Sequence, residues 1–292
     1  MEALLPPLAP EGFSDRFPQL TSAAGERRGR VGLVLGCVQR CFDPGVNAAT
    51  VAVLQANGFD VVIPADQGCC GAVSHHQGLL EQTRELASAL VRSFEAVIGP
   101  GQAAGAQPLD AVLVAASGCG HTMKAYNAIL AEGPDAGTGE ETGFPWPVQD
   151  VHEFLAERGL AASFRSALKP LPITVAYHDA CHMIHGQGIT AQPRALLRAI
   201  PGLQLLEATE AGVCCGSAGI YNLVQPAEAA ELGRIKADDL SGTGAAVIAS
   251  ANIGCSLQLR RHLQKEGPVV MHPMELLARA AGLKGACEES KS

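Results

Sequence analysis

The stretches QGCCGA at residues 67–72 and GVCCGSAG at residues 212–219 each contain two adjacent cysteines, and each is the centre of one copy of a repeat. Cys37 is separated from the first pair by 31 residues, and the pair is separated from Cys119 by 48. In the second copy the corresponding intervals are 32 and 39 residues. The duplicated frame contains eight of the ten cysteines: Cys37, Cys69, Cys70, Cys119, Cys181, Cys214, Cys215 and Cys255. A repeat of this length predicts two similar structural units, each with the same four thiols.

Composition narrows the class of protein. The chain has 292 residues, 47% hydrophobic and 17% charged, which is enough for two domains of ordinary size. Its net charge of -8 argues against a nucleic-acid partner. It has no apolar run of roughly 18 residues, as a membrane span needs, and its start does not resemble a secretory signal. We therefore predict a cytoplasmic protein, in which ten cysteines indicate metal or redox chemistry rather than disulfides.

Short β-branched apolar runs alternate with stretches of helical periodicity in both halves. The runs from Val31, Asp60 and Ala111 predict strands in the first half, and those from Ile173, Leu203 and Ala245 predict strands in the second. This alternation predicts an α/β fold of two tandem cysteine-rich domains, each a small parallel sheet with flanking helices and each folding as its own unit. The expected divisions are a linker-like N-terminal segment, a first domain, a linker, a second domain and a tail, at 1–30, 31–160, 161–172, 173–284 and 285–292.

The positions of the cysteines predict a cofactor site in each unit. Four of them stand between a predicted strand and a predicted helix, and both pairs stand in the turn after another strand. Open parallel sheets bind ligands beyond the carboxyl ends of their strands. Helix N-termini at this edge offer backbone N–H groups that stabilise thiolates. Glycines beside the cysteines are expected to let the backbone approach a bulky cofactor closely.

The adjacent cysteine pairs bear on the kind of metal. Zinc sites usually take paired ligands from C-x2-C spacing, because two adjacent side chains rarely converge on one ion. Adjacent thiols fit better if each binds a different iron of a cluster, and four thiols are enough for a 4Fe-4S cluster. The spacing therefore favours an iron-sulfur cluster, with a zinc-stabilised scaffold as the alternative. Buried free thiols that act as small hydrophobic residues are a poor explanation of eight cysteines in register.

At these residues the sequence resembles the cysteine-rich CCG domain, which occurs in pairs in heterodisulfide reductase B subunits, lactate-utilisation iron-sulfur proteins and glycolate oxidase iron-sulfur subunits. The resemblance covers residues 31–284 and matches both repeats in order. It is closest to the glycolate oxidase subunit in the phrases ANGFDVVIPADQGCCGA, CCGSAGIYNLVQP and IASANIGCSLQLRRHL, at residues 56–72, 214–226 and 248–263.

The resemblance implies an electron-transfer subunit with no catalytic residues of its own. Separate FAD-linked subunits would oxidise glycolate to glyoxylate, and this chain would pass the electrons on toward a quinone or another respiratory acceptor. The FAD would then lie only on the partner, and the complex would sit in the cytoplasm or on the cytoplasmic face of the inner membrane. A heterodisulfide-reductase-like thiol-disulfide reductase, which would need an open cysteine-lined cavity, and a subunit of an L-lactate utilisation complex remain as alternatives.

The sequence departs from this family pattern in two places. Longer members begin with a ferredoxin-like domain, and nothing here matches its cysteine runs. A truncated gene model, a split gene with that domain on a separate chain, and a shorter paralogue remain as alternative explanations. The fullest form of the motif also ends in C-x2-C, whereas Thr122 and Gln258 stand at the positions of the last cysteine. A cluster held by five cysteines is therefore not expected.

Other polar residues lie close to the frame. His178, Asp179 and His182 flank Cys181 and are candidates to tune or ligate a cluster, although a satisfied polar turn is an equally good explanation. The same alternatives apply to His121 beside Cys119. His75 and His76, which follow the first cysteine pair, are candidates to face a partner or a quinone, with ordinary exposed histidines as the alternative. Cys41 and Cys287 have no counterpart in the other repeat and are expected to be spare thiols.

Overall fold

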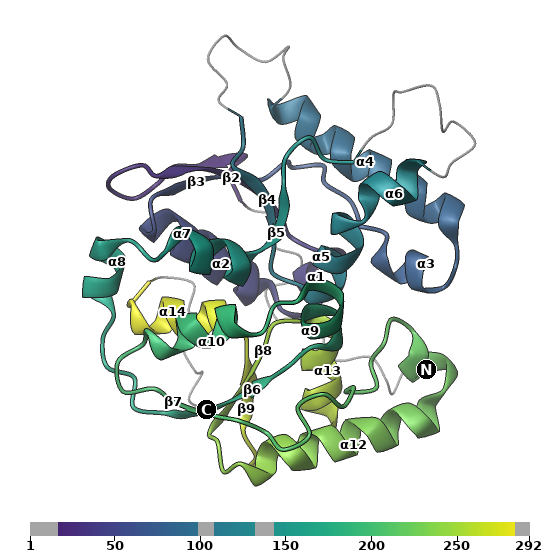
Figure 1. Cartoon of the computed structure of the whole chain (residues 1–292), viewed down its shortest axis with the longest axis vertical. Coiled ribbons are helices and arrows are strands. Elements are labelled where there is room, and N and C mark those ends of the chain that lie inside the picture. Colours follow the sequence, from purple (N-terminus) through teal and green to yellow (C-terminus); the bar gives the residue numbers. More distant parts are fainter. Residues whose placement is uncertain (1–16, 99–107, 132–142, 284–292) are drawn as a thin grey trace.

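A computed structural model describes residues 17–98, 108–131 and 143–283 of the chain. Cys287 therefore lies outside the described residues. The described part contains two mainly parallel sheets with helices on their faces (Figure 1), as the alternation of apolar runs and helical periodicity predicts.

The two sheets repeat one strand order. The first is β1-β3-β2-β4-β5, in which only β1 is antiparallel to its neighbour; its strands in chain order are Leu20–Thr21, Gly29–Val34, Phe59–Val62, Ala111–Val114 and Val148–Asp150. The second is β7-β6-β8-β9, all parallel, with β6 to β9 at Thr174–His178, Gln204–Leu206, Val247–Ser250 and Val269–Met271. Strands β3-β2-β4-β5 thus correspond in order to β7-β6-β8-β9, which confirms a duplicated fold.

Helices connect the strands on both faces of each sheet. In the first half, α1 to α8 span Cys37–Phe42, Pro44–Ala56, Ala72–His76, Leu80–Ile98, Ser117–Lys124, Tyr126–Ala131, Val151–Arg158 and Ala162–Ala167. In the second half, α9 to α14 span Cys181–Gln187, Ala191–Arg198, Tyr221–Val224, Pro226–Gly242, Ile253–His262 and Pro273–Ala280. Local sequence explains several of these helix starts. Pro44 and Pro226 each begin a helix with a pre-set backbone angle, and Asp150 and Glu153 form a capping box on α7.

Four helices, α2, α7, α10 and α14, lie between the two sheets, and α2 packs on α14 while α7 packs on α10 (Figure 1). Because α2 corresponds to α10 and α7 to α14, these two contacts are the same contact made twice about an approximate two-fold axis. Outer helices cover the opposite faces, with α4 and α6 on the first sheet and α12 and α13 on the second.

The two halves share one hydrophobic core. A single cluster of fully buried side chains runs from β2 and α7 of the first half to β6 and α14 of the second, and includes Val31, Phe154, Val175 and Leu277. The stretch 161–172, which is expected to be a linker, contains α8, and its Phe164 is buried in the same cluster. The expectation that each repeat folds as its own unit therefore disagrees with the packing.

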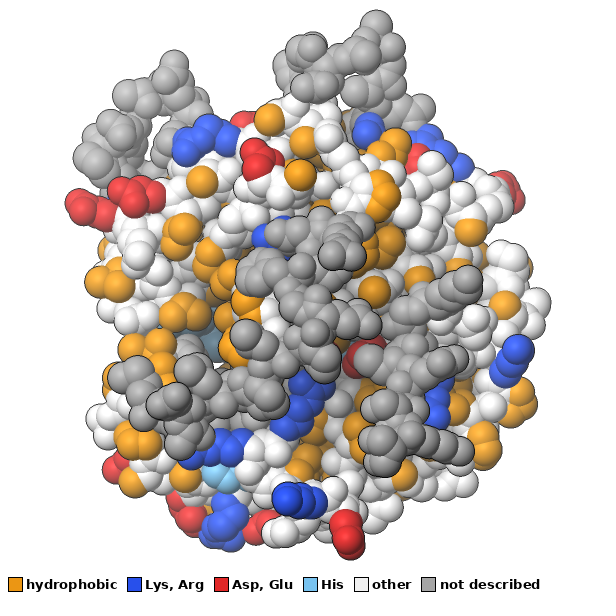
Figure 2. All heavy atoms as spheres, turned by 180° about the vertical axis from the view of Figure 1, so that it is seen from behind, with side chains coloured by type: hydrophobic (Ala, Val, Ile, Leu, Met, Phe, Trp, Pro, Cys, Tyr) orange, Lys and Arg blue, Asp and Glu red, His pale blue; other side chains and the backbone are white. Residues whose placement is uncertain are grey.

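The surface of the described residues carries mixed charge. On the rear face, Lys and Arg side chains stand among Asp and Glu side chains and scattered hydrophobic ones (Figure 2). Several of the charges are paired, such as Arg27 with Asp60 and Arg234 with Glu231. Within the described residues, none of the helices is both long enough and apolar enough to span a membrane.

Candidate metal centres at the domain boundary

Four cysteines lie at helix starts directly after parallel strands, as the sequence predicts. Cys37 and Cys181 are the first residues of α1 and α9, and Cys119 and Cys255 are the third residues of α5 and α13. These helices follow β2 and β4 in the first half, and β6 and β8 in the second. Chain connections leave these two neighbouring strands in opposite directions, which opens a ligand-binding crevice at their carboxyl ends.

Each cysteine pair lies in the loop after the strand beside β2 or β6, namely β3 or β7, and is followed by a glycine in the left-handed region. Gly71 has φ of 75° and Gly216 has φ of 82°. A Cβ atom on Gly216 would lie 2.5 Å from the carbonyl oxygen of Ala229, and one on Gly71 would lie 3.2 Å from that of Thr83. The expectation that these glycines make room for a cofactor is therefore wrong at both positions. They make room for the backbone of the next long helix.

The first four thiols converge. The Sγ atoms of Cys37 and Cys69 are 3.4 Å apart, and the Gly71 N–H donates to Cys69 Sγ at 3.4 Å. Hydrogen bonds from Cys37, from Cys70 and from Gly71 hold the pKa of Cys69 well below its usual range. The pKa of Cys37 is raised, first by its hydrogen bond to Cys69 and then by burial. The loop thus favours a thiolate at the first cysteine of the pair.

The second four thiols repeat this arrangement. The Gly216 N–H donates to Cys214 Sγ at 3.3 Å. Hydrogen bonds from Cys181 and Cys215 lower the pKa of Cys214 well below its usual range. The pKa of Cys255 is also lowered, first by its hydrogen bond with Cys215. Both halves therefore present a thiolate-stabilising group of four sulfurs, which is the donor set that soft metals such as iron in iron-sulfur clusters prefer.

All eight cysteines of the frame line one cavity of about 730 Å³ between the two halves. The approximate two-fold axis explains why: α5 packs on α9, and α1 packs on α13, so each helix that carries a cysteine of one half meets one from the other half. The two groups of thiols thus line the same cavity. The sequence predicts the two groups but not that they lie next to each other.

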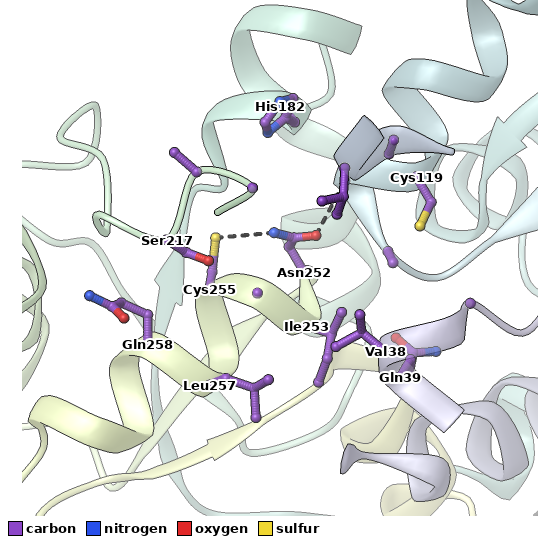
Figure 3. A pocket seen from close by; sticks show the side chains of 18 of the residues that line it. Val38, Gln39, Cys119, His182, Ser217, Asn252, Ile253, Cys255, Leu257 and Gln258 are labelled. Atoms are coloured by element: carbon purple, nitrogen blue, oxygen red, sulfur yellow. Dashed lines mark hydrogen bonds between the residues drawn. The ribbon is translucent and has the colours of Figure 1, made fainter. Parts of the chain in front are cut away.

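Asn252 connects the two groups. Its Nδ2 donates to Cys255 Sγ at 3.3 Å, and its Oδ1 accepts from the backbone N–H of Gly118 at 3.2 Å. In Figure 3, Cys255 and Cys119 lie on either side of this side chain. Asn252 could not be predicted from the repeat. The corresponding position of the first repeat is Ala116, so the residue has no matching partner in the other half.

Comparison with known proteins agrees with the duplicated fold. A family described as the cysteine-rich domain CCG matches residues 31–124 and, a second time, residues 175–260. The chain belongs to the CCG family.

The chain is similar to curated proteins that are named as parts of different redox systems. A probable glycolate oxidase iron-sulfur subunit of Bacillus subtilis is 32% identical over 97% of this chain and 62% of that protein. One of the subunits of the CoM/CoB fumarate reductase of Methanothermobacter marburgensis is 31% identical over 86% of this chain and 46% of that protein. A lactate utilization protein A of Exiguobacterium is 29% identical over 85% of this chain and 96% of that protein. The chain therefore spans less than two thirds of the first two relatives and nearly all of the third.

His178 lies beneath the second thiol group of this CCG protein. Its side chain is 2% exposed, at the end of β6. One of its ring nitrogens and the Sγ atoms of Cys215 and Cys255 all lie within 4.8 Å of one another. From the sequence, His178 is either a ligand or tuning residue of a cluster or part of a satisfied polar turn. Its ring nitrogens have no partner apart from an interaction with the thiol of Cys255, so a satisfied polar turn does not describe it.

Asp179 has a structural role. Both of its carboxylate oxygens accept hydrogen bonds from Arg194, at 2.8 and 2.6 Å. The same guanidinium stacks on the ring of Tyr177 at 4.8 Å and pairs with Glu207. Asp179 is therefore held in an ion pair that fixes the turn before Cys181 and is not free to ligate a metal.

The other histidines that the sequence analysis names form one group, and two of them, His76 and His182, line the cavity. The ring of His182 is 4.7 Å from that of His76 and 5.5 Å from that of His121, measured between ring centres, and His75 lies 6.1 Å from His76. These rings come from both halves of the chain. They contact one another rather than the sulfur groups, apart from a 3.7 Å approach of His182 Nδ1 to Cys181 Sγ.

The residues that stand where a fifth cysteine would lie have other partners. The Gln258 amide donates to the carbonyl of Ala229 at 2.9 Å, and the Thr122 hydroxyl contacts the carbonyl of Gly118 at 3.4 Å. Cys41 lies on α1 and is absent from the residues that line the cavity. The residues present therefore fit a metal group held by four thiols in each half.

Proposed function

We propose that this chain is an iron-sulfur electron-transfer subunit of a complex that oxidises glycolate or another 2-hydroxy acid. One observation carries the proposal: two groups of four thiols, each with a stabilised thiolate, line the same cavity. The glycolate oxidase name of a relative that matches 97% of this chain supports the choice of complex.

The proposed ligands are the eight cysteines of the repeat. Cys37, Cys69, Cys70 and Cys119 would hold one iron-sulfur cluster of 4Fe-4S type, and Cys181, Cys214, Cys215 and Cys255 would hold another. A bound cluster supplies one-electron redox chemistry. The protein's contribution is to deprotonate the ligands, to donate N–H groups to their sulfur atoms and to keep both groups beside one cavity, where an electron has a short distance to cross.

The 2-hydroxy acid would be oxidised on a partner. Oxidation of glycolate to glyoxylate releases two electrons and two protons, which a flavin can accept together. We assign that flavin, as FAD, to a partner subunit, and a quinone or another respiratory acceptor to the far end of the chain of electron transfer. We place the complex in the cytoplasm or on the cytoplasmic face of the membrane.

Single cysteine variants test the ligand assignment. Protein purified and reconstituted without oxygen should contain iron and sulfide, and replacement of Cys70 or Cys215 by Ser should remove much of the iron from one half. The variants should also be less stable, because the free energy of metal binding is coupled to folding. Cys41→Ser is the matched control, since Cys41 lies one helical turn from Cys37 but outside the cavity.

Three outcomes would contradict this proposal. Stoichiometric zinc without iron would favour the scaffold alternative. A Cys41→Ser variant that loses as much iron as Cys70→Ser would show that the first site is misassigned. Turnover of glycolate by the isolated chain with an artificial acceptor would overturn the assignment of substrate oxidation to a partner.

A thiol-disulfide reductase is the second candidate, because the cavity lined with cysteines meets the requirement for a disulfide substrate to reach them. Reduction of a small disulfide by the reduced isolated chain would favour it. The lactate-utilisation relative, of which this chain covers 96%, makes lactate the main competing substrate for the electron-transfer complex. Bleaching of the visible absorption of the assembled complex by lactate but not by glycolate would select it.

A further inference from the structure

The two thiol groups differ in the side chains beneath them. In the first sheet, Val34 and Val114 are paired across neighbouring strands β2 and β4, at the end nearest the cysteines. In the second sheet, the corresponding pair across β6 and β8 is His178 and Ser250. All four side chains are at least 98% buried. An apolar floor in the first half is therefore replaced by a polar one in the second.

The polar floor has few partners among the described residues. The Ser250 hydroxyl is buried without a hydrogen bond, and the imidazole of His178 has no hydrogen-bond partner apart from its interaction with the thiol of Cys255. Buried polar groups with so few partners are costly, and in folded proteins they call for a ligand, an ion or a water. The Val34 and Val114 pair shows that the fold does not require polar side chains here. The imidazole is thus directed at the thiol group rather than at a structural partner elsewhere in the protein.

The neighbours of the imidazole identify that partner as a metal. His178, Cys215 and Cys255 form the one group of at least three possible metal ligands with mutually close donor atoms in the described part of the chain. The residue that replaces a fifth cysteine, Gln258, donates through its amide to the carbonyl of Ala229 and supplies no thiolate. Imidazole replaces thiolate as an iron ligand in some iron-sulfur centres.

We propose that His178 supplies a nitrogen ligand to the metal centre of the second half, so that the two centres are chemically different. This proposal rests on the proposed iron-sulfur function. The first centre has only thiolate ligands, whereas the second has thiolates and a neutral imidazole. The imidazole would add a neutral donor to the four thiolates, so the two centres would carry the same ligand charge but differ in ligand type and number. Axial and additional ligands tune the potential of such centres, so the two would differ in reduction potential.

Pulsed electron paramagnetic resonance tests this ligand directly. The full chain is reconstituted with iron and sulfide, partly reduced, and compared with protein labelled with ¹⁵N-histidine. We expect a strongly coupled nitrogen that changes with the label. The variant His178→Val copies the side chain of the first half; it should keep the signal of the first centre, lose the nitrogen coupling and change the potential of the second centre.

Two further variants keep the test decisive. His178→Cys offers a thiolate at the same place, so it should retain iron in the second centre without nitrogen coupling even if His178→Val folds poorly. His182→Gln is the matched control, because His182 lines the cavity beside Cys181 but its ring lies against that of His76. This control should retain the strong nitrogen coupling of the second centre.

The outcomes separate this inference from the proposed function. Nitrogen coupling that persists in His178→Val, that disappears in His182→Gln, or that is only as weak as in a hydrogen bond to sulfur would overturn the ligand assignment while the iron-sulfur function stands. Wild-type protein that takes up iron in both halves without any coupled nitrogen would do the same. Wild-type protein that takes up no iron would overturn both.

Discussion

At the scale of single residues, Asn252 is the side chain that joins the two thiol groups. It donates to a sulfur of the second group and accepts from the backbone beside Cys119 in the first. Hydrogen bonds to ligand sulfurs raise the potential of iron-sulfur centres. Asn252 is therefore placed to affect both the redox properties of one centre and the contact between the halves.

Replacement of Asn252 by Ala should lower the potential of the second centre and reduce the free energy of unfolding by about 0.5–1.5 kcal/mol, because the partly buried N–H of Gly118 loses its hydrogen-bond acceptor. Redox titration and denaturant unfolding of the reconstituted chain measure the two effects. Gln187→Ala is the control: the Gln187 amide also crosses between the halves, to the carbonyl of Ser117 at 3.0 Å, but it does not contact a sulfur. An equal shift of potential in both variants would contradict a specific role for Asn252.

Residues that obey the repeat were predictable from sequence, and those that break it were not. The eight cysteines recur in register, so their spacing was sufficient to predict two groups of four thiols. His178 was noted only as a neighbour of Cys181, because its importance depends on the strand register that pairs it with Ser250. Asn252 was missed because its partner, Gly118, is 134 residues away in sequence. The role of Gly216 also depends on how closely α12 packs against it, and local sequence does not contain that distance.

At the scale of elements, the contact between α14 and α2 contains a buried acid. The carboxylate of Glu275, the third residue of α14, accepts from the backbone N–H of His272 at 2.7 Å. Burial, and then the nearby carboxylate of Asp43, raise the pKa of Glu275 to about 7. Arg260, which pairs with Asp43 at 2.7 Å, acts in the opposite direction. This helix contact therefore contains a proton-binding group near neutral pH.

This raised pKa gives a pH dependence of stability with a definite sign. The folded chain retains a proton on Glu275 that the unfolded chain, with an ordinary value of 4.5, releases. The resulting stability is complete below pH 4.5 and is lost as the pH rises to about 7, by an amount on the order of 3 kcal/mol. Glu275→Gln keeps the hydrogen-bond acceptor and removes the titration.

Unfolding free energies of wild type and Glu275→Gln across this pH range measure the effect. The difference between the two proteins should change between pH 4.5 and 7 and favour the variant above that range. Asp43→Asn removes one cause of the raised pKa and should move the change to lower pH. If the difference in unfolding free energy between the two proteins stays constant across this range, Glu275 has the same pKa in the folded and unfolded chains.

The order of elements could be predicted from sequence better than their packing. Apolar runs and helical periodicity placed the strands and most helices, because those patterns are local. The packing of residues 161–172 could not be predicted in this way. Their composition favours a linker, yet Phe164 is buried in the shared core. Burial against an element far away in sequence is a tertiary effect that no window of local sequence contains.

At the scale of the whole molecule, one core joins two repeats that the sequence presents as separate units. The buried cluster between the sheets contains residues of both halves, and the cavity beside it takes four thiols from each. If one half unfolded while the other stayed folded, the folded half would therefore expose its large apolar face to water. Exposure of that surface makes partial unfolding costly, which favours a single cooperative transition.

A substitution in the outer core of the second half tests this coupling, because the chain has a single tryptophan and it lies in the first half. Trp146 packs against the outer core of the first half, and Leu259, fully buried, packs in the outer core of the second. Leu259→Ala removes buried methyl groups and should reduce stability by about 2–5 kcal/mol. If the halves unfold together, the Trp146 fluorescence transition must shift as far as the circular dichroism transition. In a molecule whose halves unfold separately, the fluorescence transition would stay at its wild-type denaturant concentration while the dichroism transition splits in two.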